Sequence, residues 1–441
     1  MAQAQTAYLN TFYRKIFVMD EQKKLDLRLV GKAPLTGIQQ LQARAKDGDA
    51  VAQNTLGDCH YYGKGVPQSY ADAVIWYHKA AEQGLAEAQN NLGDCYFKGI
   101  SFQKSYEEAA IWYLKAALQG LAKAQCLLGH CYAKGLGVAK DDKQAVKWYC
   151  KAAEQGEAEA QYLLGHCFSG GRGVERDQEH AIIWYHKAAD RGLAAAQLLL
   201  GHCYSRGLGV EKDAAHALQW YRKAAEQGLP EAQKELGICY YDGNDVQQDY
   251  ALAAEWYRKA AEQGLPEAQY LLGHCYSRGL GVRQDNGQAL AYYRSAARQG
   301  YVKALMTLGH YYSKGCHGVS QDVTLAVTCF RQAAEQGWAD AQSRLGDCYF
   351  HGHGVPQSYD SAFSWYRKAA EQGDANAQYF LGECYYHGTG VEPDYAQALA
   401  WYHKSAKQDF GKAVAKLKEL HKNHTSKMSS LNKMWHRVKP R

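Results

Sequence analysis

The sequence predicts an all-α solenoid, and three repeated features carry this prediction. A 36-residue unit recurs ten times between residues 52 and 412 of the 441-residue chain. Each copy holds two stretches whose apolar residues recur every three or four positions, as on one face of a helix. Each copy also places Gly after the first stretch and Asp or Ser before the second. A fixed period of this length is typical of stacked units that bury their apolar faces against neighbouring units.

The first stretch of each copy reads as a helix that ends at a glycine. In the fifth copy, Ala196, Leu200, Cys203 and Tyr204 stand at i, i+4, i+7 and i+8, which places them on one helix face. Gly207 follows, and glycine caps a helix end most easily because it adopts the left-handed conformation without strain. All ten copies have Gly at this position, from Gly63 to Gly388.

The second stretch reads as a helix that begins after a capping side chain. In the fifth copy, Asp213 precedes an apolar stripe that runs from Ala217 to Ala225. Asp and Ser side chains accept hydrogen bonds from the unpaired amides at a helix start. The position holds one of these two residues in every copy: Ser69, Ser105, Asp141, Asp177, Asp213, Asp249, Asp285, Asp322, Ser358 and Asp394.

A glycine also occurs inside the first helix of every copy, from Gly57 to Gly382. Glycine in a helix interior costs about 1 kcal/mol relative to alanine. Its repetition therefore predicts that a neighbouring helix approaches closely. We expect the Trp220 ring and its equivalents on the second helix to fill the space that the glycine leaves.

The chain divides around the repeats. We expect a partly helical segment at 1–34, a half-repeat cap at 35–51, ten repeats at 52–412, a capping helix at 413–421 and a basic tail at 422–441. From Lys412 onward the chain has nine Lys or Arg residues and one Glu, a net charge of +8. The remainder of the chain then carries −2 of the total charge of +6, so the array is nearly neutral.

The thirteen cysteines do not form a disulfide framework in this interpretation. Nine of them share one repeat position, and equivalent atoms in stacked units lie about 8–10 Å apart or more. A disulfide requires Cα atoms within about 7 Å, so we expect small buried apolar residues. We see neither a secretory signal nor an apolar run long enough to span a bilayer. These features predict a reducing, cytoplasmic setting, or delivery into a host cell if the source is an intracellular bacterium.

The repeated motif resembles the Sel1-like repeat, a relative of the tetratricopeptide repeat. In the fifth copy the resemblance is carried by Ala196-Gln197, Leu200-Gly201, Cys203-Tyr204, Gly207-Leu208-Gly209-Val210 and Trp220-Tyr221-Arg222-Lys223-Ala224-Ala225. The resemblance implies a right-handed α/α superhelix that acts in protein–protein interaction, as adaptors and scaffolds do in signalling or in bacterial contact with host cells. Some secreted members have two cysteines per repeat, and a few are penicillin-binding or β-lactamase-like. This chain has one regular cysteine per copy and departs from that group.

Candidate binding residues are sought where the copies differ, because the matching positions serve the fold. Residues four apart share a helix face, so the third, seventh and eleventh positions of the first helix lie together. In related superhelices the first helices line the concave surface, which here would be a groove for an extended, acidic segment of a partner protein. A solvated face without a partner remains the alternative. The candidate groove residues are His130, Lys134, Tyr162, His166, His202, Arg206, Tyr270, His274, Arg278, His310 and Lys314.

Metal binding and catalysis are not expected. Neighbouring residues on a helix point about 100° apart, so Cys131 would face the core while His130 faces outward. No close-spaced pairs of zinc-ligand type occur. The segment Gly207-Leu208-Gly209 follows a helix rather than a strand, so it does not form a dinucleotide site. We therefore expect no cofactor, no metal, no small-molecule substrate and no nucleic-acid partner.

The sequence is best explained by a non-catalytic scaffold or adaptor that binds a protein partner in the groove. Two alternatives stay open. The first is a penicillin-binding or β-lactamase-like hydrolase. The second is a membrane-surface tether through the basic tail, since Met428, Leu431, Met434 and Trp435 have weak helical spacing among cationic residues.

Overall fold

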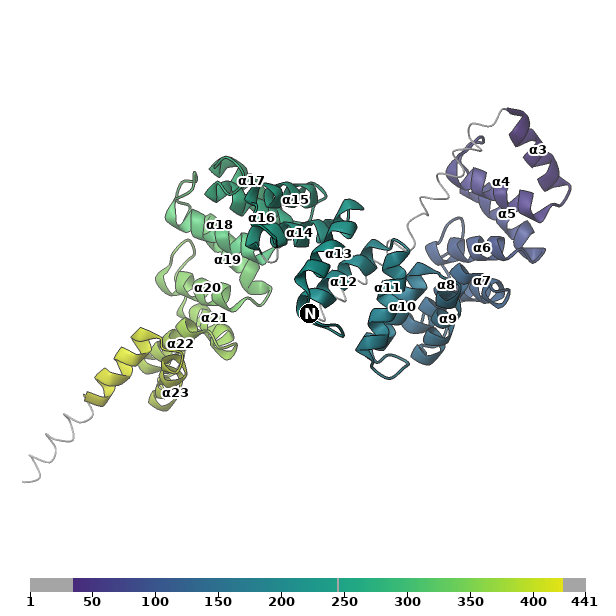
Figure 1. The fold of residues 1–441 in the computed structure, drawn as a ribbon. Coiled ribbons are helices and arrows are strands. Elements are labelled where there is room, and N and C mark those ends of the chain that lie inside the picture. Colours follow the sequence, from purple (N-terminus) through teal and green to yellow (C-terminus); the bar gives the residue numbers. More distant parts are fainter. Residues whose placement is uncertain (1–34, 244–245, 423–441) are drawn as a thin grey trace, which may run out of the picture. The chain divides into compact units, whose positions relative to one another are not determined.

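The computed structural model describes residues 35–243 and 246–422 of the chain (Figure 1). It divides into two compact units, which meet in the sequence between Gln227 and Gly228. Each unit consists of consecutive antiparallel helix pairs, and no strand occurs among the described residues. The prediction of an all-α solenoid of helix-turn-helix repeats is confirmed. The predictions for 1–34 and for the basic tail beyond residue 422 concern segments outside the described residues.

The helices are short and nearly uniform in length. Those of the first unit are α3 Leu35–Lys46, α4 Ala50–Tyr62, α5 Tyr70–Glu82, α6 Ala86–Lys98, α7 Tyr106–Leu118, α8 Ala122–Lys134, α9 Asp142–Glu154, α10 Ala158–Gly170, α11 Gln178–Asp190, α12 Ala194–Arg206 and α13 Ala214–Glu226. Those of the second unit are α14 Pro230–Asp242, α15 Tyr250–Glu262, α16 Pro266–Arg278, α17 Asn286–Arg298, α18 Val302–Lys314, α19 Val323–Glu335, α20 Ala339–His351, α21 Tyr359–Glu371, α22 Ala375–His387 and α23 Tyr395–Ala406. From α4 onward, even-numbered helices are the first helices of repeats and odd-numbered helices are the second.

The predicted caps are present in all ten repeats. Every second helix from α5 to α23 begins after the expected Ser or Asp, whose side chain accepts a backbone N–H of the first turn. Every first helix from α4 to α22 ends at the expected glycine in the left-handed conformation, as at Gly207 with φ 69° and ψ 43°. Both predictions succeed because capping depends on the local chain alone.

The glycine inside each first helix receives a tyrosine ring, which corrects the expectation that tryptophan fills this space. A Cβ atom added to Gly57 would lie 2.7 Å from the Tyr77 ring, and one added to Gly129 would lie 2.7 Å from the Tyr149 ring. In the eighth repeat, Phe330 faces Gly309 in the same way. The deepest aromatic of each helix pair is therefore the residue that follows the tryptophan position.

The tryptophans lie at the edge of the core beneath a lysine. Trp220 is 8% exposed, and the Lys223 ammonium stands 4.0 Å from its ring centroid. The lysine three residues after the tryptophan makes this contact in eight repeats. Trp112, Trp148 and Trp220 pack in clusters that include the second helix of the preceding repeat, as Trp148 does with Ala116 and Tyr113. The ring thus covers the seam, the line of contact between neighbouring repeats, and a lysine cation lies over its exposed face.

A glutamine relay, which the sequence reading missed, links successive helices. The Gln125 amide donates to the backbone carbonyl of Ala117 on the preceding second helix at 3.1 Å. Gln155, at the end of the repeat, donates to the Gln125 side-chain oxygen at 2.8 Å. The full relay recurs from Gln53, Gln89, Gln197, Gln269, Gln342 and Gln378. Because these amides are buried, their pairing fixes the register between helices.

The second glycine of each Gly-x-Gly segment lets the loop approach the preceding repeat. Gly209 has φ 72°, and a Cβ atom added there would lie 2.8 Å from the backbone oxygen of Gln178 on α11. Gly137, Gly173 and Gly281 make the same approach to α7, α9 and α15. The segment therefore serves packing between repeats, in agreement with the absence of a dinucleotide fingerprint.

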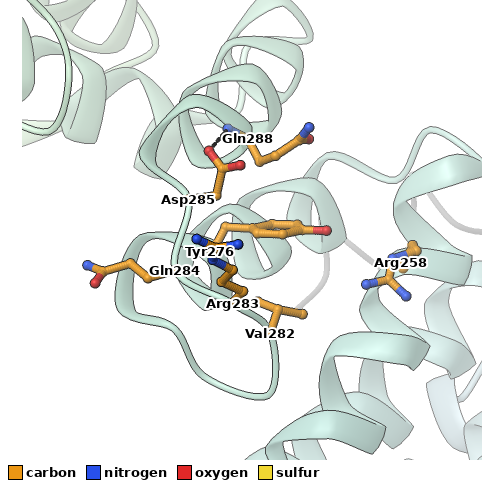
Figure 2. Close-up of a pocket in the computed structure, with 7 residues that line it drawn as sticks. All are labelled: Arg258, Tyr276, Val282, Arg283, Gln284, Asp285 and Gln288. Atoms are coloured by element: carbon orange, nitrogen blue, oxygen red, sulfur yellow. Dashed lines mark hydrogen bonds between the residues drawn. The ribbon is translucent and has the colours of Figure 1, made fainter.

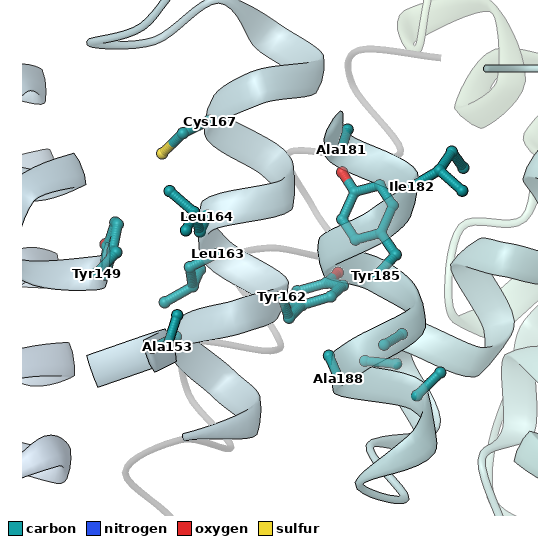
Figure 3. Close-up of a cluster of buried hydrophobic side chains, with 14 of the residues drawn as sticks. Tyr149, Ala153, Tyr162, Leu163, Leu164, Cys167, Ala181, Ile182, Tyr185 and Ala188 are labelled. Carbon is teal, nitrogen blue, oxygen red and sulfur yellow. The ribbon is translucent and has the colours of Figure 1, made fainter. Parts of the chain in front are cut away.

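Seven of the nine regular cysteines are buried core residues, as predicted, whereas Cys239 and Cys348 are partly exposed. Cys59, Cys95, Cys131 and Cys275 are at most 1% exposed, and all thirteen cysteines are free thiols. Burial raises the pKa of the Cys131 thiol to about 12. Figure 3 shows another of them, Cys167, with the buried side chains of α10 and α11, where the Tyr162 and Tyr185 rings lie 6.0 Å apart between centroids.

Both ends of the described chain pack on a neighbouring repeat. Helix α3 places Ile38 and Ala45 against Ala52 and Leu56 of α4, as a half-repeat would. A last helix spans 411–422 and buries Ala413 and Leu420. The Lys416 ammonium on this helix lies 3.4 Å from a Glu383 carboxylate oxygen and over the Tyr386 ring.

Candidate functional site

In several repeats the seventh residue of the first helix is hydrogen-bonded to the second helix of the same repeat. The Tyr77 hydroxyl donates to the Asp58 carboxylate at 2.7 Å, and the Tyr366 hydroxyl donates to Asp347 at the same distance. In the fifth repeat the Tyr221 hydroxyl and His202 Nδ1 lie 2.9 Å apart in a hydrogen bond. The expectation that His130 faces outward is wrong, because this side chain is 6% exposed, and His202 at the same position is hydrogen-bonded to Tyr221. The side chain at this position therefore holds the tyrosine whose ring fills the glycine notch, the space beside the glycine inside the first helix.

In the first unit, the predicted groove residues differ in how far they reach the surface. Lys134 and Arg206, in the last turns of α8 and α12, are exposed. His166 and His202 are partly buried, and His130 and Tyr162 are buried at 6% and 1% exposure. The Tyr162 and His166 rings contact each other, with centroids 4.5 Å apart. A partner on this face would meet the two cations first.

In the second unit, the predicted residues follow the same gradient. Arg278 and Lys314, in the last turns of α16 and α18, are exposed. Tyr270, His274 and His310 are partly buried behind them. The Tyr270 ring lies 5.5 Å from the Tyr301 ring, and the His310 ring lies 5.5 Å from the Phe330 ring, in both cases between centroids.

The buried histidines on these faces are held neutral. Burial, with the Lys134 charge nearby, lowers the pKa of His130 to about 4. Burial and the Arg172 charge lower the pKa of His166 to about 4. Burial also lowers the pKa values of His274 and His310. Near pH 7 the positive charge of the faces therefore comes from Lys and Arg.

A hollow of about 290 Å³ lies in the first unit between the third and fourth repeats. Its wall includes Lys134 at the end of α8, Lys140 in the following loop and Arg172 in the loop after α10. His166 and Asp142 complete its polar lining. Two of the predicted groove residues, Lys134 and His166, thus meet at one hollow. Lys140 and Arg172 lie in loops, where the search along helix faces could not find them.

A second hollow, of about 760 Å³, opens in the second unit around the loop between α16 and α17. Figure 2 shows Arg283, Gln284 and Val282 on this loop, with Arg258 reaching it from α15. Asp285 accepts the backbone N–H of Gln288 at 2.9 Å, so its carboxylate is engaged as a helix cap. None of the predicted groove residues lines this hollow.

Metal and membrane features were also sought in the structure. Within 35–243 and 246–422, no three His, Cys, Asp or Glu side chains are grouped as metal ligands would be. None of the helices described is long and apolar enough to cross a bilayer. No observation on these residues favours the hydrolase alternative.

Comparison with known proteins agrees with the repeated motif. The family model for the Sel1 repeat matches ten consecutive segments that together span residues 50–410. Each segment begins two residues before the repeat boundary used above, at the first residue of a first helix. No curated protein matches the chain.

Two solved structures resemble the chain over most of its length. One is c5321, described as a protective antigen of uropathogenic Escherichia coli with an SLR fold. It is 37% identical, covers 89% of this chain and 91% of its own, and has a TM-score of 0.59. The other is a Sel1 repeat protein from Oxalobacter formigenes. It is 36% identical, covers 70% of this chain and 90% of its own, and has a TM-score of 0.58. With ten matched repeats and these two relatives, the chain belongs to the Sel1 repeat family.

Proposed function

We propose that this protein is a non-catalytic adaptor that binds an extended, acidic segment of a partner protein on the first-helix face of each unit. Sel1 repeat solenoids are a fold typically used for protein–protein interaction. The partner contacts Lys134 and Arg206 in the first unit and Arg278 and Lys314 in the second. The proposed setting is the cytoplasm, or the cytoplasm of a host cell.

The observation that carries this proposal is the sign of the charge that the first helices expose. Lys134, Arg206, Arg278 and Lys314 all occupy the last turn of a first helix, and all four are exposed. The histidines behind them carry little charge near pH 7, because burial depresses their pKa values. Exposed cations on a face of partly buried aromatic rings favour an acidic partner through charge complementarity.

Pull-down experiments with charge-reversed variants test this proposal one unit at a time. The first variant combines Lys134→Glu with Arg206→Glu, and the second combines Arg278→Glu with Lys314→Glu. A matched control combines Lys143→Glu with Lys147→Glu on the second helix α9, where both lysines are exposed. It changes the net charge by the same amount on a different face.

The expected result is that at least one face variant loses a partner that wild type and control both recover. Such partners should carry an acidic segment, and their recovery should fall as salt rises. If both face variants recover the same proteins as wild type, the first-helix faces are solvated surface and the proposal is wrong.

A further inference from the structure

The hollow between the third and fourth repeats is lined by three cations. Lys134, Lys140 and Arg172 line it together with a single carboxylate, that of Asp142. Burial lowers the pKa of Lys134, and the charges of Arg172 and Lys140 lower it further. The Lys134 ammonium is therefore close enough to both of these charges to be repelled by them. An oxyanion among them would be held by charge-assisted hydrogen bonds.

This cation cluster depends on a departure from the repeat pattern. Arg172 stands where the third, fifth and seventh repeats have Leu136, Leu208 and Leu280. Gly170 replaces the exposed cation that ends α8 and α12. The fourth repeat thus has its cation in the loop, beside the hollow. Features that recur in every repeat serve the fold, whereas this one does not recur.

His166 supplies a second, independent sign of a ligand. Its Nε2 atom is buried, and no described group lies within hydrogen-bond distance of it. The ring is held between Tyr162 and Tyr185, at 4.5 and 5.4 Å between centroids. The equivalent ring of His202 is satisfied by the Tyr221 hydroxyl. An unsatisfied buried polar atom is unfavourable, and a neutral imidazole can donate one N–H to an anion.

We propose that this hollow binds the carboxylate of an acidic side chain in the partner segment. The proposal rests on the proposed function, because it names the point at which that segment is anchored to the first unit. A volume of about 290 Å³ admits a compact oxyanion with its hydration water. Arg172 and Lys140 hold the oxyanion from the loops, Lys134 holds it from α8, and His166 Nε2–H donates from the floor.

Binding of a fluorescein-labelled hexaglutamate peptide to the full chain tests the site by fluorescence anisotropy at low ionic strength. The diagnostic variant is Arg172→Leu, which installs the residue that three other repeats carry and should fold. Its matched control is Arg176→Leu, the same substitution in the same loop at an exposed residue that does not line the hollow. The expected result is binding about tenfold weaker in Arg172→Leu and within about twofold of wild type in Arg176→Leu.

Equal losses in the two variants would mean that the peptide senses net charge only, which overturns the proposal. A wild-type chain that does not bind hexaglutamate overturns it as well. Inorganic phosphate is the second probe. Phosphate that displaces the peptide from wild type supports a shared oxyanion site. Phosphate binding without peptide binding would mean that the hollow binds a free anion, which overturns the proposal that it binds an acidic side chain of the partner. The pull-down with face variants is scored separately, so the adaptor function can stand when this anchor fails.

Discussion

The fifth and eighth repeats solve the same packing problem with different residues. Helix α13 carries Trp220, Tyr221 and Lys223, whereas α19 carries Cys329, Phe330 and Gln332 at the same positions. Both aromatic rings after the tryptophan position face the glycine of the first helix, at Gly201 and Gly309. An aromatic ring therefore fills the glycine notch in both repeats, whereas an indole covers the seam only in the fifth.

A hollow lies at this contact between repeats in the eighth repeat, and a smaller one, of about 490 Å³, lies at the equivalent place in the fourth repeat beside Trp184 and Lys187. Where α13 has its indole and lysine, the eighth repeat opens a hollow of about 640 Å³ whose wall includes Leu305, Leu308 and Cys329. The residues that line it come from α17, α18 and α19. The equivalent helices of the second and third repeats, α7, α8 and α9, surround Trp148. The comparison separates two roles that adjacent aromatic positions play, one in the core and one at the seam.

The largest expected loss of stability comes from removing the aromatic ring that fills the glycine notch. Tyr221→Ala should lower the local free energy of unfolding by about 3–5 kcal/mol, because it leaves a cavity against Gly201 and removes the partner of His202. Phe330→Ala should cost a similar amount in the eighth repeat. Hydrogen exchange of the amides in α12, α13, α18 and α19 measures both. A loss confined to one of the two repeats would break the equivalence of Tyr221 and Phe330.

The next effect comes from making the fifth repeat resemble the eighth. Trp220→Cys should lower the local free energy of unfolding by about 2–4 kcal/mol, since it uncovers apolar surface of α11 and α12. The same exchange measurement applies. A loss larger than that of Tyr221→Ala would show that tryptophan, and not tyrosine, is the principal core residue.

The reverse exchange should be favourable. Cys329→Trp should raise the local stability of the eighth repeat by about 0.5–2 kcal/mol, because the indole fills an existing hollow. Cys329→Ser, which cannot fill the space, is the control. Destabilisation by the tryptophan would mean that the lining of the hollow has repacked in a way that no longer admits the ring.

The smallest effect concerns the lysine over the indole. Lys223→Gln introduces the residue that the eighth repeat has at this position. It should lower the local free energy of unfolding by about 0.5–1 kcal/mol through loss of the cation–π contact. The cost should vanish in a Trp220→Cys background, since the ring is then absent. A cost that persists there would assign the lysine another role.

The sequence was sufficient for features that depend on a few adjacent residues. All ten N-caps and all ten glycine C-caps were predicted, because cap geometry is set within one helical turn. The ring that fills the notch was misassigned from Trp220 to its neighbour, because two adjacent aromatic residues fit the same helical stripe. Which of them faces the first helix depends on how the two helices are rotated about their axes, and spacing does not fix this rotation.

The candidate site was predicted in part for a similar reason. Lys134, Arg206, Arg278 and Lys314 reach the surface because long cationic side chains extend past a helix end. His130 and Tyr162 share their helix face by spacing but are buried, since neighbouring helices cover the inner part of that face. The hollow with Arg172 and Lys140 requires two loops to meet, which repeat alignment alone cannot show.

Site-specific photo-cross-linking tests the central claim most directly, since it maps where the partner lies on each unit. A photoreactive side chain is placed in turn at positions 134 and 206 in the first unit and at 278 and 314 in the second. Positions 147 and 367, exposed on the second helices α9 and α21, serve as controls. We expect adducts with one acidic partner from the first-helix positions and none from the controls. Adducts of equal yield from the second-helix positions would contradict it.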